Sequence, residues 1–205
     1  MDGIIKTSKT LLHTKGGREM TSEITVEIQC DKKTAMEILK KGGYALTKNW
    51  TQVSLYWTNL DISKTVDYKT LITNSLLVRT AESECVIMHK IKQFDDNGNV
   101  IAEEKVQQKV QDAYTTNKIF ELSGFKNWVV MTAEQLILTN GKTEFCMQDV
   151  EGLGLYLEAE NNNGESLDGL ISFANGLRLP LGDDFVGVKL PYLVYLKNTQ
   201  EKETK

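Results

Sequence analysis

Apolar and polar residues alternate along 23–30. The even-numbered positions are apolar and the odd-numbered positions are polar: Ile24, Val26, Ile28 and Cys30 against Glu23, Thr25, Glu27 and Gln29. Successive side chains of a β-strand point to opposite faces of its sheet. The pattern therefore predicts a strand with one buried face and one polar face.

Three segments show the helical spacing of apolar residues instead. The predicted helices cover 32–41, 113–122 and 167–176. Each follows a residue whose side chain can cap the first turn, and a glycine lies at or just beyond each end: Asp31, Asp112 and Ser166 before, and Gly42, Gly124 and Gly176 after. Such residues are typical of helix termini.

Strand patterns occupy most of the remaining chain. The predicted strands lie at 52–57, 75–79, 84–93, 101–111, 128–131, 134–138, 144–150 and 155–160, and the last regular segment is expected at 189–196. Two turn sequences, Asp95-Asp-Asn-Gly98 and Asn140-Gly141, are typical of hairpins between antiparallel strands. Many antiparallel strands and few helices predict an α+β fold built on one large curved sheet or barrel.

Length and composition are those of one globular domain. The chain has 205 residues, of which 40% are hydrophobic and 25% are charged, which is enough to build one core. We expect a flexible N-terminal extension at 1–21, a single domain at 22–198 and a disordered polar tail at 199–205.

The net charge, the hydropathy and the cysteines argue against several classes of protein. A net charge of −4 argues against a general nucleic-acid binder, because such a protein needs a basic surface. No apolar run reaches transmembrane length and no signal peptide is visible, so we expect a cytoplasmic protein that does not bind membranes. Cys30, Cys85 and Cys146 lie in separate apolar strands, which predicts buried reduced thiols. A zinc site is not expected, since the chain has two histidines.

Charged residues gather on single faces of several strands. They include Glu27 on the first strand, Arg79, Lys90 with Lys92, Lys105 with Lys109, and Glu158 with Glu160. If these faces point into the curved sheet, they line a polar channel in which basic groups bind phosphates and carboxylates bind a divalent cation. If they point outward, they are a solvated surface. Glu158 and Glu160, after the turn 151–154, either bind a cation or face solvent, because two carboxylates on one strand face repel unless water or a cation separates them.

Eight segments, in order along 23–197, resemble a known family. They are Thr25-Val-Glu-Ile-Gln29, Gly42-Gly-Tyr44, Tyr56-Trp-Thr-Asn59, Leu76-Leu-Val-Arg79, Val86-Ile-Met-His-Lys90, Leu122-Ser-Gly-Phe125, the glycine turn and paired-glutamate strand at 149–160, and Pro191-Tyr-Leu-Val-Tyr-Leu196. In this order they resemble the CYTH superfamily, which includes class IV adenylate cyclases and thiamine triphosphatases. The segment at 149–160 is the most specific match.

The resemblance implies a triphosphate tunnel, an eight-stranded antiparallel barrel with helices packed outside. Such a tunnel binds a triphosphate or nucleotide together with divalent cations, here Mg²⁺ or Mn²⁺. The metal ligands implied are Glu27, Glu158 and Glu160. The phosphate-binding residues expected are Arg79, Lys90, Lys92, Lys105 and Lys109, of which no motif assigns Lys105 and Lys109.

The chain departs from the family pattern at several phosphate-binding positions. The family begins with E-x-E-x-K, of which Thr25, Glu27 and Gln29 keep one residue. A register two residues earlier keeps Glu23 but puts Glu27 in place of the lysine. The first arginine of the L-R-x-R strand is Leu77 here.

Two classes of function follow. In the first, the protein is a metal-dependent triphosphatase or adenylate cyclase. In the second, it is a catalytically degenerate tunnel protein that binds a small anionic ligand or a protein partner. The oligomeric state is open, and a dimer is compatible with either class.

Two polar residues near these motifs are expected to be structural. Asp149 is interpreted as a turn residue more readily than as a ligand. His89 has the opposite strand parity to Lys90, so we expect it to face the outer layer of the fold.

Overall fold

The computed structural model describes residues 22–62, 64, 66–96, 98, 100–161, 166–185 and 189–203. The strands are β1 (Ser22–Ile28), β2 (Ala45–Thr58), β3 (Ser75–Ala81), β4 (Glu84–Phe94), β5 (Val100–Val110), β6 (Lys126–Thr139), β7 (Glu144–Val150) and β8 (Gly154–Asn161). The α-helices in these residues are α1 (Lys32–Lys41), α2 (Tyr68–Thr73), α3 (Ala113–Leu122), α4 (Leu167–Gly176) and α5 (Leu190–Glu203). The predicted extension at 1–21 lies outside the described residues.

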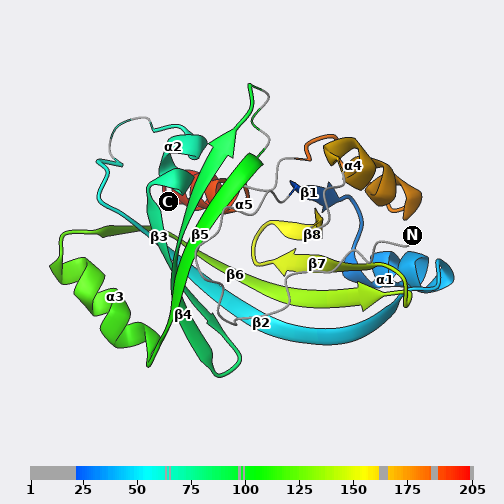
Figure 1. Cartoon of the computed structure of the whole chain (residues 1–205), viewed down its shortest axis with the longest axis horizontal. Helices are drawn as coiled ribbons and strands as arrows, with labels where there is room; N and C mark the ends of the chain where they lie inside the picture. The colour runs from blue at the N-terminus through cyan, green and yellow to red at the C-terminus, as the bar shows by residue number, and fades with distance from the viewer. Residues whose placement is uncertain are drawn as a thin grey trace.

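The strands form one antiparallel sheet in the order β1-β8-β7-β6-β2-β3-β4-β5. Figure 1 shows β2 and β6 as two long bent strands that cross the molecule, with α3 at one end and α1 and α4 at the other. The prediction of an α+β fold with eight antiparallel strands is confirmed. The three predicted helices are also confirmed, and Asp31, Asp112 and Ser166 cap them by accepting a hydrogen bond from the backbone N–H three residues later.

The largest hydrophobic core lies on the convex face of the sheet, under α1 and α4. Its fully or nearly fully buried members include Ile24, Val26, Leu39, Leu136, Leu157 and Leu170. A second convex cluster packs Phe120 of α3 against Trp57, Val78 and Cys85. The convex face thus takes up the apolar positions of each strand and leaves the alternate positions for the concave face.

Helix α5 lies on the concave face, which corrects the prediction that the helices pack outside. Its buried residues Leu190 and Val194 belong to one cluster with Val129, Met131 and Tyr156. Strand pairing puts these three sheet residues on the same face as the charged positions. The helix continues to Glu203, so residues 199–203 of the predicted disordered tail are helical, and 204–205 lie outside the described residues. The buried residues of α5 lie in its first half, and the helix continues past them along mostly exposed positions.

The sheet is not closed into a barrel by backbone pairing in the described residues. The segment 180–185 runs along the edge of β1 that does not pair with β8, and it forms hydrogen bonds with the backbone there. The amide of Gln29 donates to Pro180 O at 2.7 Å and that of Gly182 donates to Glu27 O at 2.9 Å. Since this segment uses the hydrogen-bonding groups of β1, they are not available to β5, and the closed barrel of the prediction becomes an open, strongly curved sheet.

Other differences from the predictions are local. Residues 128–138 belong to one long strand, β6, rather than to two, and helix α2 was not predicted. Cys85 and Cys146 are buried and Cys30 is half-buried, and all three are free thiols, as expected. In the described part of the chain, each helix falls short of the length or the apolar content that a membrane span requires.

Candidate functional site

Strand pairing gathers eight charged side chains on the concave face. We call them the ionic cluster: Glu23, Arg79, Lys90, Lys92, Glu103, Lys105, Glu158 and Glu160. Six of them form three pairs of residues that lie opposite each other on neighbouring strands. Glu23 lies opposite Glu160 on β8, and Lys90 and Lys92 of β4 lie opposite Lys105 and Glu103 of β5. The period-two alternation of each strand explains why one face receives the charges from all of these strands.

Ion pairs join the two edges of the sheet. Lys92 Nζ lies 2.8 Å from Glu103 and 3.7 Å from Glu23 on β1. Lys90 Nζ also lies 3.3 Å from Glu103. Lys92 is only 8% exposed. Burial opposes its charge, but Glu23 and Glu103 outweigh this effect and raise the pKa of Lys92. Side chains therefore bridge the seam that backbone hydrogen bonds leave open.

Glu103 is stabilised as a carboxylate at this seam. Burial works against its charge, but Lys90 and Lys92 together lower the pKa of Glu103 to about 2. A carboxyl group this far below its ordinary pKa is ionised at any physiological pH. Glu103 therefore neutralises part of the positive charge that the lysines offer to an anionic ligand.

Glu158 and Glu160 form the acidic side of the cluster. Burial, followed by the neighbouring charges of Glu23 and Glu160, raises the pKa of Glu158 to about 8. Burial and Glu23 also raise the pKa of Glu160. Gln148 Nε2 donates a hydrogen bond to Glu158. Raised values mark carboxylates that lack sufficient positive charge nearby, which is the condition that a bound cation relieves.

Arg79 and Lys105 are the two cations of the cluster without an ion pair in the described residues. Arg79 Nε donates to Ser54 Oγ at 3.3 Å. In the described residues, neither cation has a carboxylate oxygen within 4.0 Å. The side chain of Lys105 is exposed, yet partial desolvation, followed by the positive charge of Lys90, lowers the pKa of Lys105 against the opposing effects of Glu103 and Glu160. Repulsion among these three cations favours an anion between them.

Two of the predicted site residues lie apart from the cluster. Lys109 is exposed and pairs with Glu84. Glu27 is exposed, lies opposite Tyr156 rather than opposite Glu158 or Glu160, and lines a separate cavity. Their roles as phosphate and metal ligands stay predictions. The other predicted residues, Arg79, Lys90, Lys92, Lys105, Glu158 and Glu160, share the ionic cluster.

Glu23 and Glu103 belong to the ionic cluster but are not among the site residues predicted from the sequence. Both had a signal in the sequence. Glu23 has the same strand parity as Glu27, and Glu103 has the same parity as Lys105. Parity alone did not show which residues along each face meet across the sheet, because that depends on the pairing of strands far apart in the chain.

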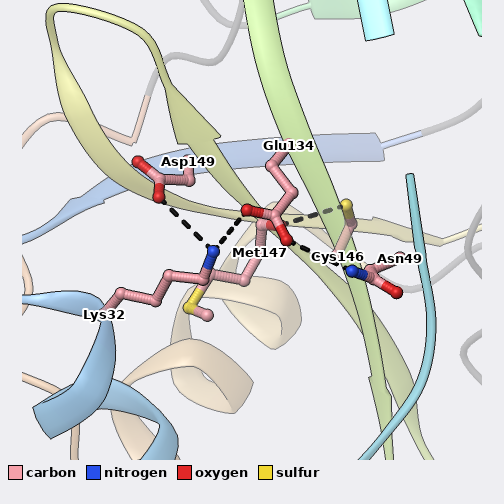
Figure 2. Close-up of polar contacts among 6 residues, drawn as sticks. All are labelled: Lys32, Asn49, Glu134, Cys146, Met147 and Asp149. Atoms are coloured by element: carbon pink, nitrogen blue, oxygen red, sulfur yellow. Dashed lines mark hydrogen bonds and ion pairs between the residues drawn. The ribbon is translucent and has the colours of Figure 1, made fainter. Parts of the chain in front are cut away.

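Asp149 lies in strand β7 and not in a turn as predicted, and His89 faces the outer layer as expected. Figure 2 shows Asp149 and Glu134 around the ammonium group of Lys32, which lies 3.6 Å from Asp149, and Asn49 donating to Glu134 at 3.2 Å. These residues occupy the strand positions opposite to those of the ionic cluster. His89 Nε2 lies 3.0 Å from the carbonyl oxygen of Thr73, also away from the cluster.

The cluster contains the type of ligand that a divalent cation prefers, but its carboxylates are not arranged around one ion position. Three carboxylates, Glu23, Glu158 and Glu160, supply the oxygen donors that Mg²⁺ and Mn²⁺ prefer. Within the described ranges, however, no three acidic, cysteine or histidine side chains converge closely enough to hold one ion. Binding such an ion here requires that the carboxylate side chains turn toward one another.

Known proteins share this architecture. A protein of Methanocaldococcus jannaschii named "Putative adenylate cyclase MJ0240" is 29% identical over 140 residues, which cover 68% of this chain and 75% of that protein. A solved structure from Pyrococcus horikoshii, the PH1012 protein, has a TM-score of 0.63 at 19% identity and covers 85% of this chain and 99% of its own. No family model matches the sequence.

A second solved structure has a similar fold. The protein from Vibrio parahaemolyticus is described as a putative adenylate cyclase and has a TM-score of 0.54 at 12% identity, over 78% of this chain and 90% of that one. At such identity the likeness concerns the fold. Together with the order of the sequence motifs, these likenesses confirm the predicted resemblance to the CYTH superfamily, and the fold of this chain is similar to that of the Pyrococcus and Vibrio proteins.

Proposed function

We propose that the protein binds a phosphorylated small molecule, a triphosphate or nucleotide, at the ionic cluster. The observation that carries this proposal is the group of neighbouring cations Arg79, Lys90 and Lys105 on the concave face. Their ammonium and guanidinium groups are of the kind that bind phosphate oxygens through charge-assisted hydrogen bonds. The likeness to proteins named adenylate cyclases agrees with a nucleotide as the ligand.

Charge balance makes a divalent cation part of this proposal. The cluster contains four carboxylates and four cations. A triphosphate adds about four negative charges that these side chains alone do not neutralise. Glu158 and Glu160, with Glu23 opposite, would hold Mg²⁺ or Mn²⁺, which would offset that charge. The chain's own residues would bind and orient the phosphates and keep them beside the carboxylates.

Two reactions are compatible with such a complex. Attack by water would make the protein a triphosphatase, and attack by the ribose 3′-hydroxyl of ATP would make it an adenylate cyclase. Both depend mainly on positioning and on charge stabilisation, which the rows of charged side chains on neighbouring strands would supply.

A second candidate is a tunnel protein that binds without turnover. It is favoured by the ion pairs that Lys92 makes with Glu23 and Glu103, because these pairs use a cation that a triphosphate would need. Leu77, in place of a motif arginine, has the same effect, since it removes a cation from the concave face.

The test is a panel of ATP, thiamine triphosphate and tripolyphosphate, each with and without Mg²⁺ or Mn²⁺. Binding is measured by calorimetry, and release of phosphate, pyrophosphate or cyclic AMP is measured in parallel. We expect metal-dependent binding that Lys90→Gln weakens by roughly tenfold, because one charge-assisted hydrogen bond is lost. The matched control is Lys33→Gln, which removes an exposed lysine of α1.

The outcomes separate the two candidates. Turnover with any member of the panel supports the enzyme, and binding without turnover supports the tunnel protein. If no panel member binds with either metal, or if both lysine variants weaken binding equally, the proposed phosphate site is wrong.

A further inference from the structure

Three residues of β2 continue the concave face beyond the ionic cluster. Ser54, Gln52 and Trp50 share this face, because Ser54 lies opposite Arg79 and side chains alternate along a strand. Ser54 is also the residue that accepts a hydrogen bond from Arg79. At the usual rise of a strand, Gln52 lies about 7 Å and Trp50 about 13 Å along β2 from the row that contains Arg79. These residues therefore begin at the proposed phosphate site and lead away from it.

Gln52 is a buried polar residue without a partner. It is 8% exposed, and its carboxamide makes no hydrogen bond in the part of the chain that the structure describes. A buried amide in this state is unfavourable, because it has lost water without gaining another partner. Among the described residues, the hydroxyl oxygen of Thr25 is the only fully enclosed side-chain polar atom that lacks a partner, so the amide of Gln52 keeps some accessible surface. A ligand on the concave face can therefore reach it.

The residues on either side of Gln52 cannot satisfy its amide. Gln52 lies opposite Ala81 of β3 and Ala133 of β6, whose methyl groups form no hydrogen bonds. The nearby amides are occupied, since Gln135 donates to Gln148 at 3.4 Å and Gln148 donates to Glu158. Gln52 is therefore the amide of this face that remains available to a ligand.

The chemistry of a carboxamide favours a ligand edge with a donor and an acceptor side by side. A glutamine side chain offers one carbonyl acceptor and one NH₂ donor. Adenine presents the complementary pair, the N6 amino donor and the N7 acceptor. A 6-oxopurine presents two acceptors at the same positions, O6 and N7, so one of the two hydrogen bonds is lost. A neutral amide next to Arg79 thus suits the base of a nucleotide better than its charged phosphates.

Trp50 adds an aromatic surface two residues further along the same strand face. Its side chain is half-buried, and Lys48 Nζ lies 4.7 Å from the centre of its ring. Lys48 also lies 3.3 Å from Glu82, and both of these side chains are exposed, so this pair holds Lys48 only weakly. Planar bases stack on aromatic side chains of this kind.

We propose that Gln52 and Trp50 bind the base of the ligand and favour adenine over a 6-oxopurine. The Gln52 carboxamide donates to N7 and accepts from the N6 amino group, and the indole of Trp50 stacks on the base. Arg79, Lys90 and Lys105 bind the phosphates. This inference rests on the proposed phosphate site and deepens it, because it assigns the residues that distinguish a nucleoside triphosphate from an inorganic one.

The test compares ATP, ITP and tripolyphosphate by calorimetry with the full chain and Mg²⁺. ITP differs from ATP in one group, an oxygen in place of the 6-amino group. We expect ATP to bind about tenfold more tightly than ITP, because one hydrogen bond is lost and two acceptors face each other. Gln52→Met should remove this preference and leave the affinity for tripolyphosphate unchanged. Gln108→Met, at an exposed position on the convex face of β5, is the matched control and should keep the preference.

Trp50→Leu separates stacking from hydrogen bonding. It should weaken the binding of ATP and ITP by the same factor, about tenfold, and leave tripolyphosphate binding unchanged. Tyr114→Leu, which removes an aromatic ring that is 80% exposed on α3, is the matched control.

The melting temperature of the free protein gives a reading that does not depend on the ligand. Gln52→Met should leave it equal or raise it, because the variant removes an unsatisfied buried amide. A merely structural glutamine would give the opposite result, a lower melting temperature with an unchanged preference for ATP over ITP.

The outcomes separate the base site from the phosphate site. If none of the three ligands binds, the phosphate site is wrong and the base site is wrong with it. If tripolyphosphate binds but Gln52→Met keeps the preference for ATP over ITP, or the parent chain has no such preference, the phosphate site stands and the base site is wrong. If Gln52→Met weakens tripolyphosphate as much as ATP, Gln52 binds phosphate and not the base. Circular dichroism checks that each variant is folded.

Discussion

The concave face of the sheet has two halves that are filled in different ways. Over β6, the apolar residues Leu190 and Val194 of α5 pack against Val129 and Met131. Over β1, β4 and β5, charged side chains fill the space and pair across the seam. The first half behaves as a core and the second as a site. One helix and one set of ion pairs therefore decide how much of the curved sheet remains available to a ligand.

Removing the Lys92 ammonium group from the charged half should lower the free energy of unfolding more than the other substitutions proposed for these halves. Lys92→Met keeps much of the volume of the side chain but leaves Glu23 and Glu103 buried without their shared cation. We expect the free energy of unfolding to fall by about 3–5 kcal/mol, the cost of removing one partner from a buried ion pair. Urea unfolding at neutral pH measures it.

Lys109→Met is the control for this prediction, because Lys109 pairs with Glu84 at an exposed position. Its cost should stay below about 1 kcal/mol. Adding Glu23→Gln to Lys92→Met should recover part of the loss, since it removes one of the unpaired carboxylates. Equal costs for the two lysine variants would show that the seam is not held by buried charge.

Breaking the apolar half at Val194 should have a smaller effect. Val194 is buried against the concave face, so Val194→Ala removes two methyl groups from a packed cluster. We expect a loss of about 2–3 kcal/mol in the free energy of unfolding, from lost burial and from the cavity left behind. Leu196→Ala, at a partly exposed position of the same helix, is the control. If both variants cost the same, α5 does not pack as a core element.

The period of the strands made one part of the site predictable. Alternation placed Arg79, Lys90 and Lys105 on faces that the structure confirms as one face. The same rule placed Glu158 with Glu160. These predictions succeeded because parity within a strand is a local property that needs no knowledge of the rest of the fold.

The remaining features depend on contacts between distant segments. Glu23 rather than Glu27 meets Glu160, and this choice is set by the pairing of β1 with β8, more than 100 residues apart. The segment at 180–185 has no regular pattern of its own, yet it occupies the edge of β1 and keeps the sheet open. Likewise, the apolar residues at 190–196 predict an ordered segment but do not show that it is a helix on the concave face, which depends on the sheet residues beneath it.

The pH dependence of stability tests the charged half, because Glu158 and Glu103 there have pKa values shifted in opposite directions. Glu158 has a pKa raised to about 8 from an ordinary value of 4.5. Below about pH 4.5 its carboxyl is protonated in both the folded and the unfolded chain. As the pH rises toward 8, the unfolded chain releases the proton and the folded chain keeps it, so stability is lost. Glu103, with its pKa lowered to about 2, acts in the opposite sense, since its contribution is lost as the pH falls below about 4.5.

Glu158→Gln should therefore be more stable than the parent chain at pH 8, by on the order of 3–4 kcal/mol, and within about 1 kcal/mol of it at pH 5. The amide keeps an oxygen that can accept the hydrogen bond from Gln148. Urea unfolding at several pH values between about 5 and 8 measures the difference, with Glu37→Gln as a control that should follow the parent. Saturating Mg²⁺ should shrink the difference at pH 8 if the ion binds at Glu158, because the cation stabilises the ionised carboxylate of the parent alone. Parallel profiles for the parent and Glu158→Gln would show that this carboxyl is not held protonated by its neighbours, and the acidic side of the cluster would then be an ordinary solvated surface.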